Sequence, residues 1–298
     1  MVQIKKVAIS GAAGYLGSQV LRSLIDNGSF EVTVLRRPTS TSTFPDSVRV
    51  INVDHESVPD LTEALKGQDA LILTPSSAAI LSQLPLIEAA AAAGVYRLIP
   101  SDFGSDIANE NVRKLPFFAN TKVVVESSVK EKAKSGKLTY TQIHNGAFIP
   151  YVLSGFLIDF NNPTVFDGGN SVFSATTVET VAKAVVAVLS KPAETENKTL
   201  YINDFKLTQN KLLEIAKQVA PKRSFEPKAA KLADLRAEAN DKKARGVNDF
   251  SVVVPEILSS LLDPAYGADF KNVSNELLGL QPKGEDTVAG FVKEILEK

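Results

Sequence analysis

Short apolar runs alternate with longer amphipathic stretches along the first half of the chain. The apolar runs are bounded by turn residues, which predicts strands, and the stretches between them repeat apolar positions at helical spacing. Strands alternating with helices predict a parallel sheet with helices on both faces, a doubly wound α/β fold. Strands are predicted at about 7–10, 31–35, 48–53, 70–73, 96–99 and 138–143, and helices at about 15–27, 58–66, 79–93 and 117–134.

This rhythm breaks after residue 146. Residues 147–160 are rich in large apolar side chains, which can line an apolar substrate pocket or pack as ordinary core. A short strand near Val172 and a helix over 178–189 are expected to rejoin the sheet, 199–202 is a further strand, and the pattern from 208 onward is helical. We therefore expect a sheet domain over residues 1–150 and about 171–205, and a smaller, mainly helical lobe over about 151–170 and 206–298.

Composition narrows the function classes. The 298 residues are 44% hydrophobic and 22% charged, an ordinary globular balance, and the formal net charge of −1 gives no electrostatic reason to expect nucleic acid or a membrane as partner. The absence of cysteine excludes disulfides, thiolate catalysis and zinc–thiolate sites, and no metal site is expected. The first strand begins too near the N-terminus to leave room for a signal peptide, so the expected location is the cytoplasm.

A glycine-rich turn joins the first strand to the first helix. Gly11 allows the tight turn, Gly14 lets the backbone approach a pyrophosphate, and Gly17 lets the helix pack close to the sheet. The helix N-terminus then directs free N–H groups at phosphate. The strand–turn–helix context favours a dinucleotide-binding (Rossmann) loop over a turn that needs glycine for other reasons. Its expected cofactor-binding residues are Gly11, Ala13, Gly14, Tyr15, Leu16 and Gly17.

The second strand ends in Arg36 and Arg37, where NAD-selective sites carry an acidic residue for the ribose 2′-hydroxyl. A guanidinium binds a 2′-phosphate that a carboxylate would repel, so the sequence favours NADP(H), with Arg37 preferred over Arg36. The alternative is a solvated basic turn. Asp54 follows the third strand, where it can meet the adenine amino group or simply form a turn. Thr74 and Pro75 follow the fourth strand, on the ligand side of such a sheet.

The chain resembles the NmrA-like and isoflavone-reductase-like family, an atypical branch of the short-chain dehydrogenases. The resemblance covers nearly the whole chain, strongly to about residue 205, and the family commonly has Glu in the place of Asp102. It implies a Rossmann domain that binds NADPH and a helical C-terminal part that caps the cleft. The matching segments, in order, are the glycine loop, residues 33–38, Pro100-Ser101-Asp102-Phe103-Gly104, Lys122 and 144–148.

The resemblance also implies residue roles. Phe103 would lie against the nicotinamide, and Lys122 would reach the nicotinamide ribose and act as the acid–base residue, with Ser101 and Asn145 as further cofactor contacts. Ordinary short-chain dehydrogenases have a Tyr four residues before this lysine, but here that residue is Phe118. Lys122 would therefore transfer the proton alone, which requires a lowered pKa. The alternative is an exposed helix lysine.

The substrate side of the site is predicted from a few further residues. Phe103, His144, Phe148 and Tyr151 are the candidate substrate contacts. His144 is also a candidate acid–base group, because histidine titrates near neutral pH, although a hydrogen-bonded structural role is the alternative.

Two functions of different classes fit these observations. The first is an NADPH-dependent reductase acting on a small, aromatic or conjugated substrate. The second is a non-catalytic NAD(P)-sensing regulatory protein that binds a protein partner, as some NmrA-like members are thought to do, and Phe118 is compatible with it. A third reading is a scaffold that kept only the fold. A homodimer and a complex with another protein both stay open.

Overall fold

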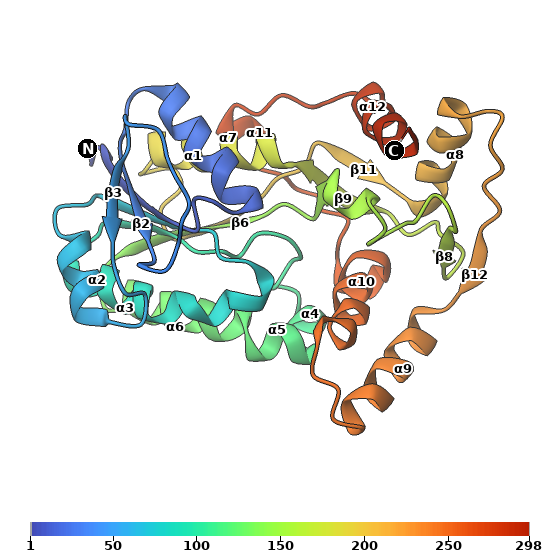
Figure 1. The fold of residues 1–298 in the computed structure, drawn as a ribbon, viewed down its shortest axis with the longest axis horizontal. Helices are drawn as coiled ribbons and strands as arrows, with labels where there is room; N and C mark the ends of the chain where they lie inside the picture. Colours follow the sequence, from blue (N-terminus) through green and yellow to red (C-terminus); the bar gives the residue numbers. More distant parts are fainter. Residues whose placement is uncertain (1, 298) are drawn as a thin grey trace.

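A seven-stranded sheet, all of its strands parallel, forms the centre of the first part of the chain (Figure 1). The computed structural model describes residues 2–297. The strand order β10-β6-β5-β4-β1-β2-β3 places β1 beside β4, where the direction of winding reverses. The predicted doubly wound α/β fold is confirmed. The strands are β1 (Lys6–Ser10), β2 (Glu31–Arg36), β3 (Arg49–Asn52), β4 (Ala70–Leu73), β5 (Arg97–Ile99), β6 (Thr139–His144) and β10 (Lys198–Tyr201).

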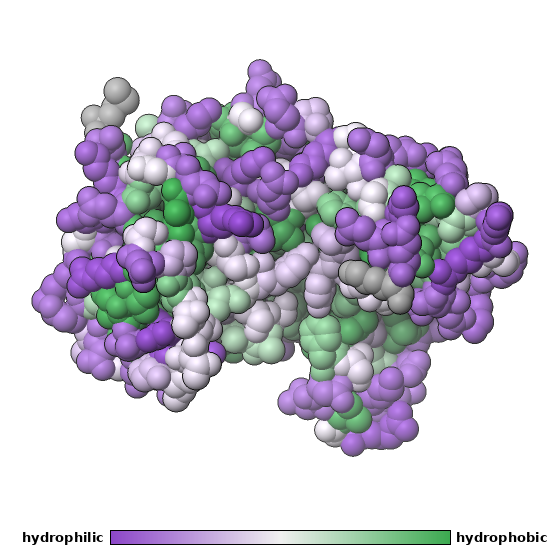
Figure 2. All heavy atoms as spheres, turned by 45° about the horizontal axis from the view of Figure 1, so that its top comes forward, coloured by the Kyte–Doolittle hydropathy of each residue, from purple (hydrophilic) through white to green (hydrophobic). Residues whose placement is uncertain are grey.

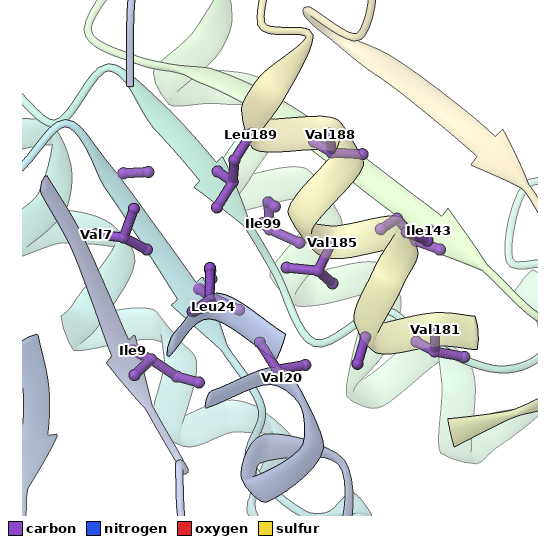
Figure 3. Close-up of a cluster of buried hydrophobic side chains, with 14 of the residues drawn as sticks. Val7, Ile9, Val20, Leu24, Ile99, Ile143, Val181, Val185, Val188 and Leu189 are labelled. Carbon is purple, nitrogen blue, oxygen red and sulfur yellow. The ribbon is translucent and has the colours of Figure 1, made fainter. Parts of the chain in front are cut away.

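Helices cover both faces of this sheet. Within β4, Ile72 packs in the cluster that includes α1 and α7, whereas Leu71 and Leu73 pack in the cluster of α2, α3 and α6. Successive side chains point to opposite faces, so a strand covered on both sides must be apolar throughout. Figure 3 shows the first cluster between the sheet, α1 and α7. The helices are α1 (Tyr15–Asn27), α2 (Val58–Leu65), α3 (Gln83–Ala93), α6 (Lys122–Lys134) and α7 (Val178–Ser190).

The second part of the chain has a core of its own. Its β7 (Ala147–Ile149), β9 (Phe173–Thr177) and β11 (Phe205–Leu207) form a three-stranded sheet, and β8 (Thr164–Phe166) pairs with β12 (Lys228–Ala230). Apolar side chains of these strands pack with those of the later helices. These helices are α8 (Gln209–Val219), α9 (Leu232–Ala244), α10 (Val254–Leu262) and α12 (Glu285–Leu296), while α11 (Asn275–Leu278) contacts α7.

Several sequence-based expectations need correction. The strand expected near Val172 is β9, and it pairs with β7 and β11 instead of rejoining the large sheet. Residues after 208 include a strand, β12, and 147–160 contain β7 and the short 3-10 helix η2 (Tyr151–Leu153). The helix expected over 117–134 is broken at Thr121 (φ −129°, ψ −85°) into α5 (Pro116–Asn120) and α6, preceded by α4 (Glu110–Lys114). The remaining 3-10 helices are η1 (Ser77–Ser82), η3 (Phe250–Val252) and η4 (Pro264–Tyr266).

One charged residue lies inside the sheet. Arg97 is fully buried in β5, and its guanidinium donates to the hydroxyls of Thr139, Thr141 and Thr195 and to the Pro192 carbonyl, at 2.7–3.0 Å. Burial lowers the pKa of Arg97. These bonds offset the cost of burying the guanidinium and connect β5 and β6 to the segment after α7.

The surface is largely polar. In Figure 2, hydrophilic residues cover both ends of the visible face, and paler and more apolar residues gather between them. None of the helices within residues 2–297 is long and apolar enough to cross a bilayer.

Candidate active site

The glycine loop after β1 lies at the reversal point of the sheet. Gly11 has φ +86°, which favours glycine, and a Cβ there would lie 2.6 Å from the Thr74 carbonyl oxygen at the end of β4. A Cβ on Gly17 would lie 2.6 Å from the Thr74 hydroxyl and closer still to the Gly11 carbonyl oxygen. Gly11 and Gly17 therefore allow α1 to begin directly against the ends of β1 and β4.

The first turn of α1 presents a surface that suits an anion. Gly14 is the N-cap residue, and Ala13, Gly14 and Tyr15 are exposed. The first N–H groups of a helix have no partner within it, and α1 has no acidic residue in its first turn to oppose a phosphate. The N-terminus of α1 therefore has the exposed backbone and the lack of acidic side chains that favour an anion.

The two arginines after β2 have different environments. Arg36 donates from Nε to Asn52 Oδ1 at 2.8 Å and from Nη1 to the Ser42 carbonyl oxygen at 2.7 Å, so it holds the loop that follows β2. Arg37 is exposed, and within residues 2–297 it makes no side-chain hydrogen bond or ion pair. Together with burial, its charge lowers the pKa of His55. Of the two arginines, Arg37 is therefore the one whose guanidinium is available to a ligand.

Lys122 is buried although it opens a helix. Its side chain is 8% exposed, and Nζ donates to the Phe103 carbonyl oxygen. In the part of the chain that the structure describes, no carboxylate forms an ion pair with it. Burial lowers the pKa of Lys122, and the charge of Asp102 acts in the opposite direction. The predicted alternative of an exposed helix lysine does not hold.

A cavity of about 120 Å³ lies beside Lys122 at the carboxyl end of the sheet. Phe118 lines this cavity and offers it only an apolar ring. The exposed rings of Tyr15 and Tyr151 lie 5.6 Å apart, and the Tyr151 ring is 6.4 Å from that of Phe156. The cavity is lined mostly by apolar and aromatic residues: Ser77, Phe103, Gly104, Ser105, Phe117, Phe118, Lys122, Gly146, Ala147, Phe148, Tyr151, Val152, Phe156, Phe250, Ile257 and Leu261.

Hydrogen bonds join the strand ends around this cavity. Thr74 Oγ1 donates to the Ser10 carbonyl oxygen at 2.9 Å. The Ser101 backbone N–H donates to Gln83 Oε1 at 2.7 Å, and the Ser101 hydroxyl donates to the Pro75 carbonyl oxygen at 3.3 Å. The glycine loop, residues 74–75 and residues 101–104 therefore lie along one edge of the sheet, as predicted for a cofactor cleft.

A sequence model of the NmrA-like family matches residues 3–230. The chain belongs to the NmrA-like family. A curated oxidoreductase, aprR of Aspergillus flavus, is 38% identical over 214 residues, which cover 70% of this chain and 71% of that protein. The oxidoreductase poxI of Penicillium oxalicum is 29% identical, covering 97% and 94%. These relatives place this NmrA-like chain among the oxidoreductases.

Plant reductases are also similar. Phenylcoumaran benzylic ether reductase PT1 of Pinus taeda is 27% identical over 214 residues, which cover 66% of this NmrA-like chain and 68% of that protein. Among solved structures, AtPrR2 with NADP⁺ and (+)-pinoresinol matches with a TM-score of 0.80 at 19% identity, covering 99% of this chain and 100% of that one. Leucoanthocyanidin reductase from Vitis vinifera, in a ternary complex, matches with a TM-score of 0.77 at 19% identity, covering 98% and 100%. The structural matches show that this NmrA-like chain has their fold.

Two expected site residues of this NmrA-like protein lie behind the cavity instead of lining it. Asn145 is fully buried, and its Oδ1 accepts the Gly104 N–H at 2.8 Å, so it supports the cavity wall. His144 is 1% exposed and packs against Asp102 and Asp106, which matches the structural alternative rather than a substrate contact. Asp54 is exposed, and its Oδ1 accepts the Glu56 N–H at 3.0 Å, the turn-forming role.

The sequence did not indicate the residues that the C-terminal part of this NmrA-like chain contributes to the cavity. Phe250, Ile257 and Leu261 come from η3 and α10. Their segments look like ordinary amphipathic helix, and only the packing of α10 against α5 brings them to Lys122. The cluster of Asp102, His144 and Asp106 was missed for a similar reason, because strand ends far apart in sequence bring it together.

Proposed function

We propose that the chain is an NADPH-dependent reductase that acts on a small, aromatic or conjugated substrate, with Lys122 as the proton donor. The observation that carries the proposal is the burial of Lys122 beside an apolar cavity, without a carboxylate partner. Burying a lysine in this way is costly, and functional sites are where such perturbed groups gather.

The residues along the sheet edge fit an NADP-type dinucleotide. The first turn of α1 would hold the pyrophosphate, and the free guanidinium of Arg37 would contact the 2′-phosphate. When bound, the cofactor supplies a hydride. Phe103 would lie on the nicotinamide side of the cavity, since it joins the 101–104 segment to the cavity wall.

Lys122 would handle the proton. Its lowered pKa brings the ammonium closer to neutral pH, where a general acid gives up a proton most effectively. Its hydrogen bond to the Phe103 carbonyl fixes Nζ at the cavity. Phe118 cannot share this task, so we assign the proton transfer to Lys122 alone.

The apolar lining supports a substrate that presents a ring or a conjugated system. Phe148 and Tyr151 are the wall residues that we expect to contact it. Its polar atom would approach Lys122.

Binding of NADPH and NADH to the purified protein, followed by calorimetry, tests the cofactor assignment. We expect at least a tenfold preference for NADPH, about 1.4 kcal/mol, that is lost in Arg37→Ala. Arg49→Ala is the matched control, because Arg49 is also exposed but lies at the opposite end of the same sheet, where β3 begins. Equal binding of both cofactors would remove Arg37 from the site, and binding of neither would overturn the proposal.

Turnover separates the reductase from the sensor. NADPH oxidation would be measured with a panel of enones, quinones and phenylpropanoid-type compounds. We expect Lys122→Met to abolish turnover while NADPH still binds. Lys134→Met, an exposed position at the end of the same helix, should keep the wild-type turnover. NADPH binding without turnover of any compound would favour the non-catalytic sensor. Wild-type turnover by Lys122→Met would overturn the role of this lysine.

A further inference from the structure

A buried charge cluster lies behind Lys122. His144 Nε2 is 3.2 Å from Asp102 Oδ2, and His144 Nδ1 is 3.3 Å from Asp106 Oδ1. The imidazole is thus placed between two carboxylates, and none of these three residues lines the cavity. Tyr201 donates its hydroxyl to Asp106 Oδ1 at 3.0 Å and lies edge-on to the imidazole, with ring centroids 5.2 Å apart.

The Asp102 carboxylate forms no hydrogen bond or ion pair with Lys122. Gln142 Nε2 donates to Asp102 Oδ2 at 2.6 Å, on the same oxygen that faces His144. Asp102 Oδ1 is buried without a hydrogen-bond partner among the described residues. Lys122 bonds instead to the carbonyl of the next residue, Phe103. The Lys122 ammonium, from α6, therefore bonds to the residue after Asp102 but forms no ion pair with the Asp102 carboxylate.

The charge state of His144 follows from its partners. Burial alone would lower its pKa, but the contacts with Asp102 and Asp106 outweigh burial and raise the pKa. The two carboxylates therefore favour the protonated, cationic form of the imidazole.

The second carboxylate near Lys122 is also paired elsewhere. Glu126 lies one turn further along α6, is 4% exposed, and forms ion pairs with Arg113 and Lys130. Each acidic group close to Lys122 thus has a cation of its own. Lys122 itself forms no ion pair within residues 2–297.

We infer that His144 is a positioning residue for the reaction, and that it acts through Asp102. As an imidazolium, His144 pairs with the Asp102 carboxylate, so that this carboxylate does not stabilise the ammonium of Lys122 as an ion-pair partner. The inference rests on the proposed function, because it matters to turnover only if Lys122 is the proton donor. It implies that His144 and Asp102 act on the pKa of Lys122 in opposite directions. Without the imidazolium, the field of Asp102 at Lys122 is stronger and its ammonium more stable. Without the carboxylate, the ammonium loses that support.

Nuclear magnetic resonance on the whole protein tests this directly. With lysine labelled isotopically at Cε and Nζ, the titration midpoint of Lys122 is read from its shifts and assigned with Lys122→Met. We expect His144→Gln to raise the midpoint and Asp102→Asn to lower it, each by about one pH unit. Tyr201→Phe, which removes a hydroxyl but no charge at neutral pH, and Lys134→Gln, which removes an exposed positive charge from the same helix, leave it unchanged.

The wild-type protein provides a measurement that needs no folded His144 or Asp102 variant. The chain has two histidines, so the imidazole resonances are assigned with His55→Gln alone. We expect His144 to be doubly protonated at pH 7, and a neutral His144 would overturn the inference. An unmoved Lys122 midpoint in His144→Gln would also overturn it.

Neither measurement requires substrate or cofactor, which separates the two possible failures. A wild-type Lys122 that titrates like the surface lysines would contradict the proposed function. A low wild-type midpoint that His144→Gln does not move would leave the proposed function standing and remove only the role of His144.

Discussion

Gly17→Ala is the substitution that tests the dinucleotide loop most sharply. The added methyl group would lie 2.6 Å from the Thr74 hydroxyl and nearer still to the Gly11 carbonyl oxygen, distances that real Cβ atoms do not adopt. The Gly11 backbone cannot easily yield, because its φ of +86° and its own contact with Thr74 fix it. The first turn of α1 must therefore move away from the strand ends.

Two opposing contributions decide the effect on stability. Forcing a methyl group into a tight contact costs about 1–3 kcal/mol, while replacing glycine by alanine in a helix interior gains up to about 1 kcal/mol. Gly17 lies in the first turn, where the helix gain is smallest, so we expect a net destabilisation of about 2 kcal/mol. Moving the first turn also displaces the N–H groups that would hold the pyrophosphate, and we expect NADPH affinity to fall at least tenfold.

Urea unfolding and NADPH titration of the same samples measure both quantities. Gly290→Ala is the control, because Gly290 lies in α12 and no neighbouring element comes within 4 Å of the position that its Cβ would take. That variant should gain up to about 1 kcal/mol and bind NADPH normally. If Gly17→Ala matched the wild type in stability and affinity, the close approach of α1 to the strands would be refuted. Lower stability with unchanged affinity would instead limit Gly17 to packing.

Three further outcomes follow from two carboxylates and one histidine, each held by hydrogen bonds or ion pairs. Asp204 accepts from the Thr177 N–H and hydroxyl and from the Thr180 hydroxyl at the start of α7, so Asp204→Ala should lower the free energy of unfolding by about 2 kcal/mol, measured in urea. Lys183 and Lys283 lower the pKa of Glu179 to about 2. The contribution of Glu179 to stability is therefore complete above its ordinary pKa of 4.5 and is lost as the pH falls toward 2. The difference in melting temperature between the wild type and Glu179→Gln should shrink over that interval. The pKa of His144 is raised, so its effect on stability has the opposite pH dependence. The charged imidazole stabilises the fold fully below the ordinary pKa of 6.5, and this stabilisation is lost as the pH rises through the pKa of the folded state. The stability difference between the wild type and His144→Gln should therefore be largest below pH 6.5.

Local patterns predicted the large sheet well, for physical reasons. The run Ala70–Leu73 is apolar at every position because helices cover both of its faces, and the structure gives the same bounds. The helix over 15–27 also has the predicted bounds, since Gly14 precedes it and Gly28 ends it in the left-handed conformation. In both cases the signal lies within a few neighbouring residues.

The smaller sheet could not be predicted in the same way. Residues 173–177 form a strand whose side chains are all buried, so its pattern resembles that of the large-sheet strands. Its partners, β7 and β11, are three-residue strands. Such short segments carry too little periodicity to be recognised. Pairing with strands distant in the sequence decides which sheet this strand joins, and the residues around Phe173 do not indicate those partners.

The site shows the same division between local and long-range information. Arg37 and the glycine loop could be proposed from the sequence because the residues that indicate their roles are adjacent in the chain. The environment of Lys122 was not, since a helix lysine in sequence gives no sign of its burial. That burial depends on Phe103, on Phe118 and on the docking of α10, where Glu256 accepts the Phe117 N–H at 2.6 Å and Lys243 donates to the same carboxylate at 2.6 Å. The pKa of Lys122 is therefore a property of how the two parts of the chain pack, and substitutions in the C-terminal helices can alter the proposed acid–base chemistry without contacting the lysine.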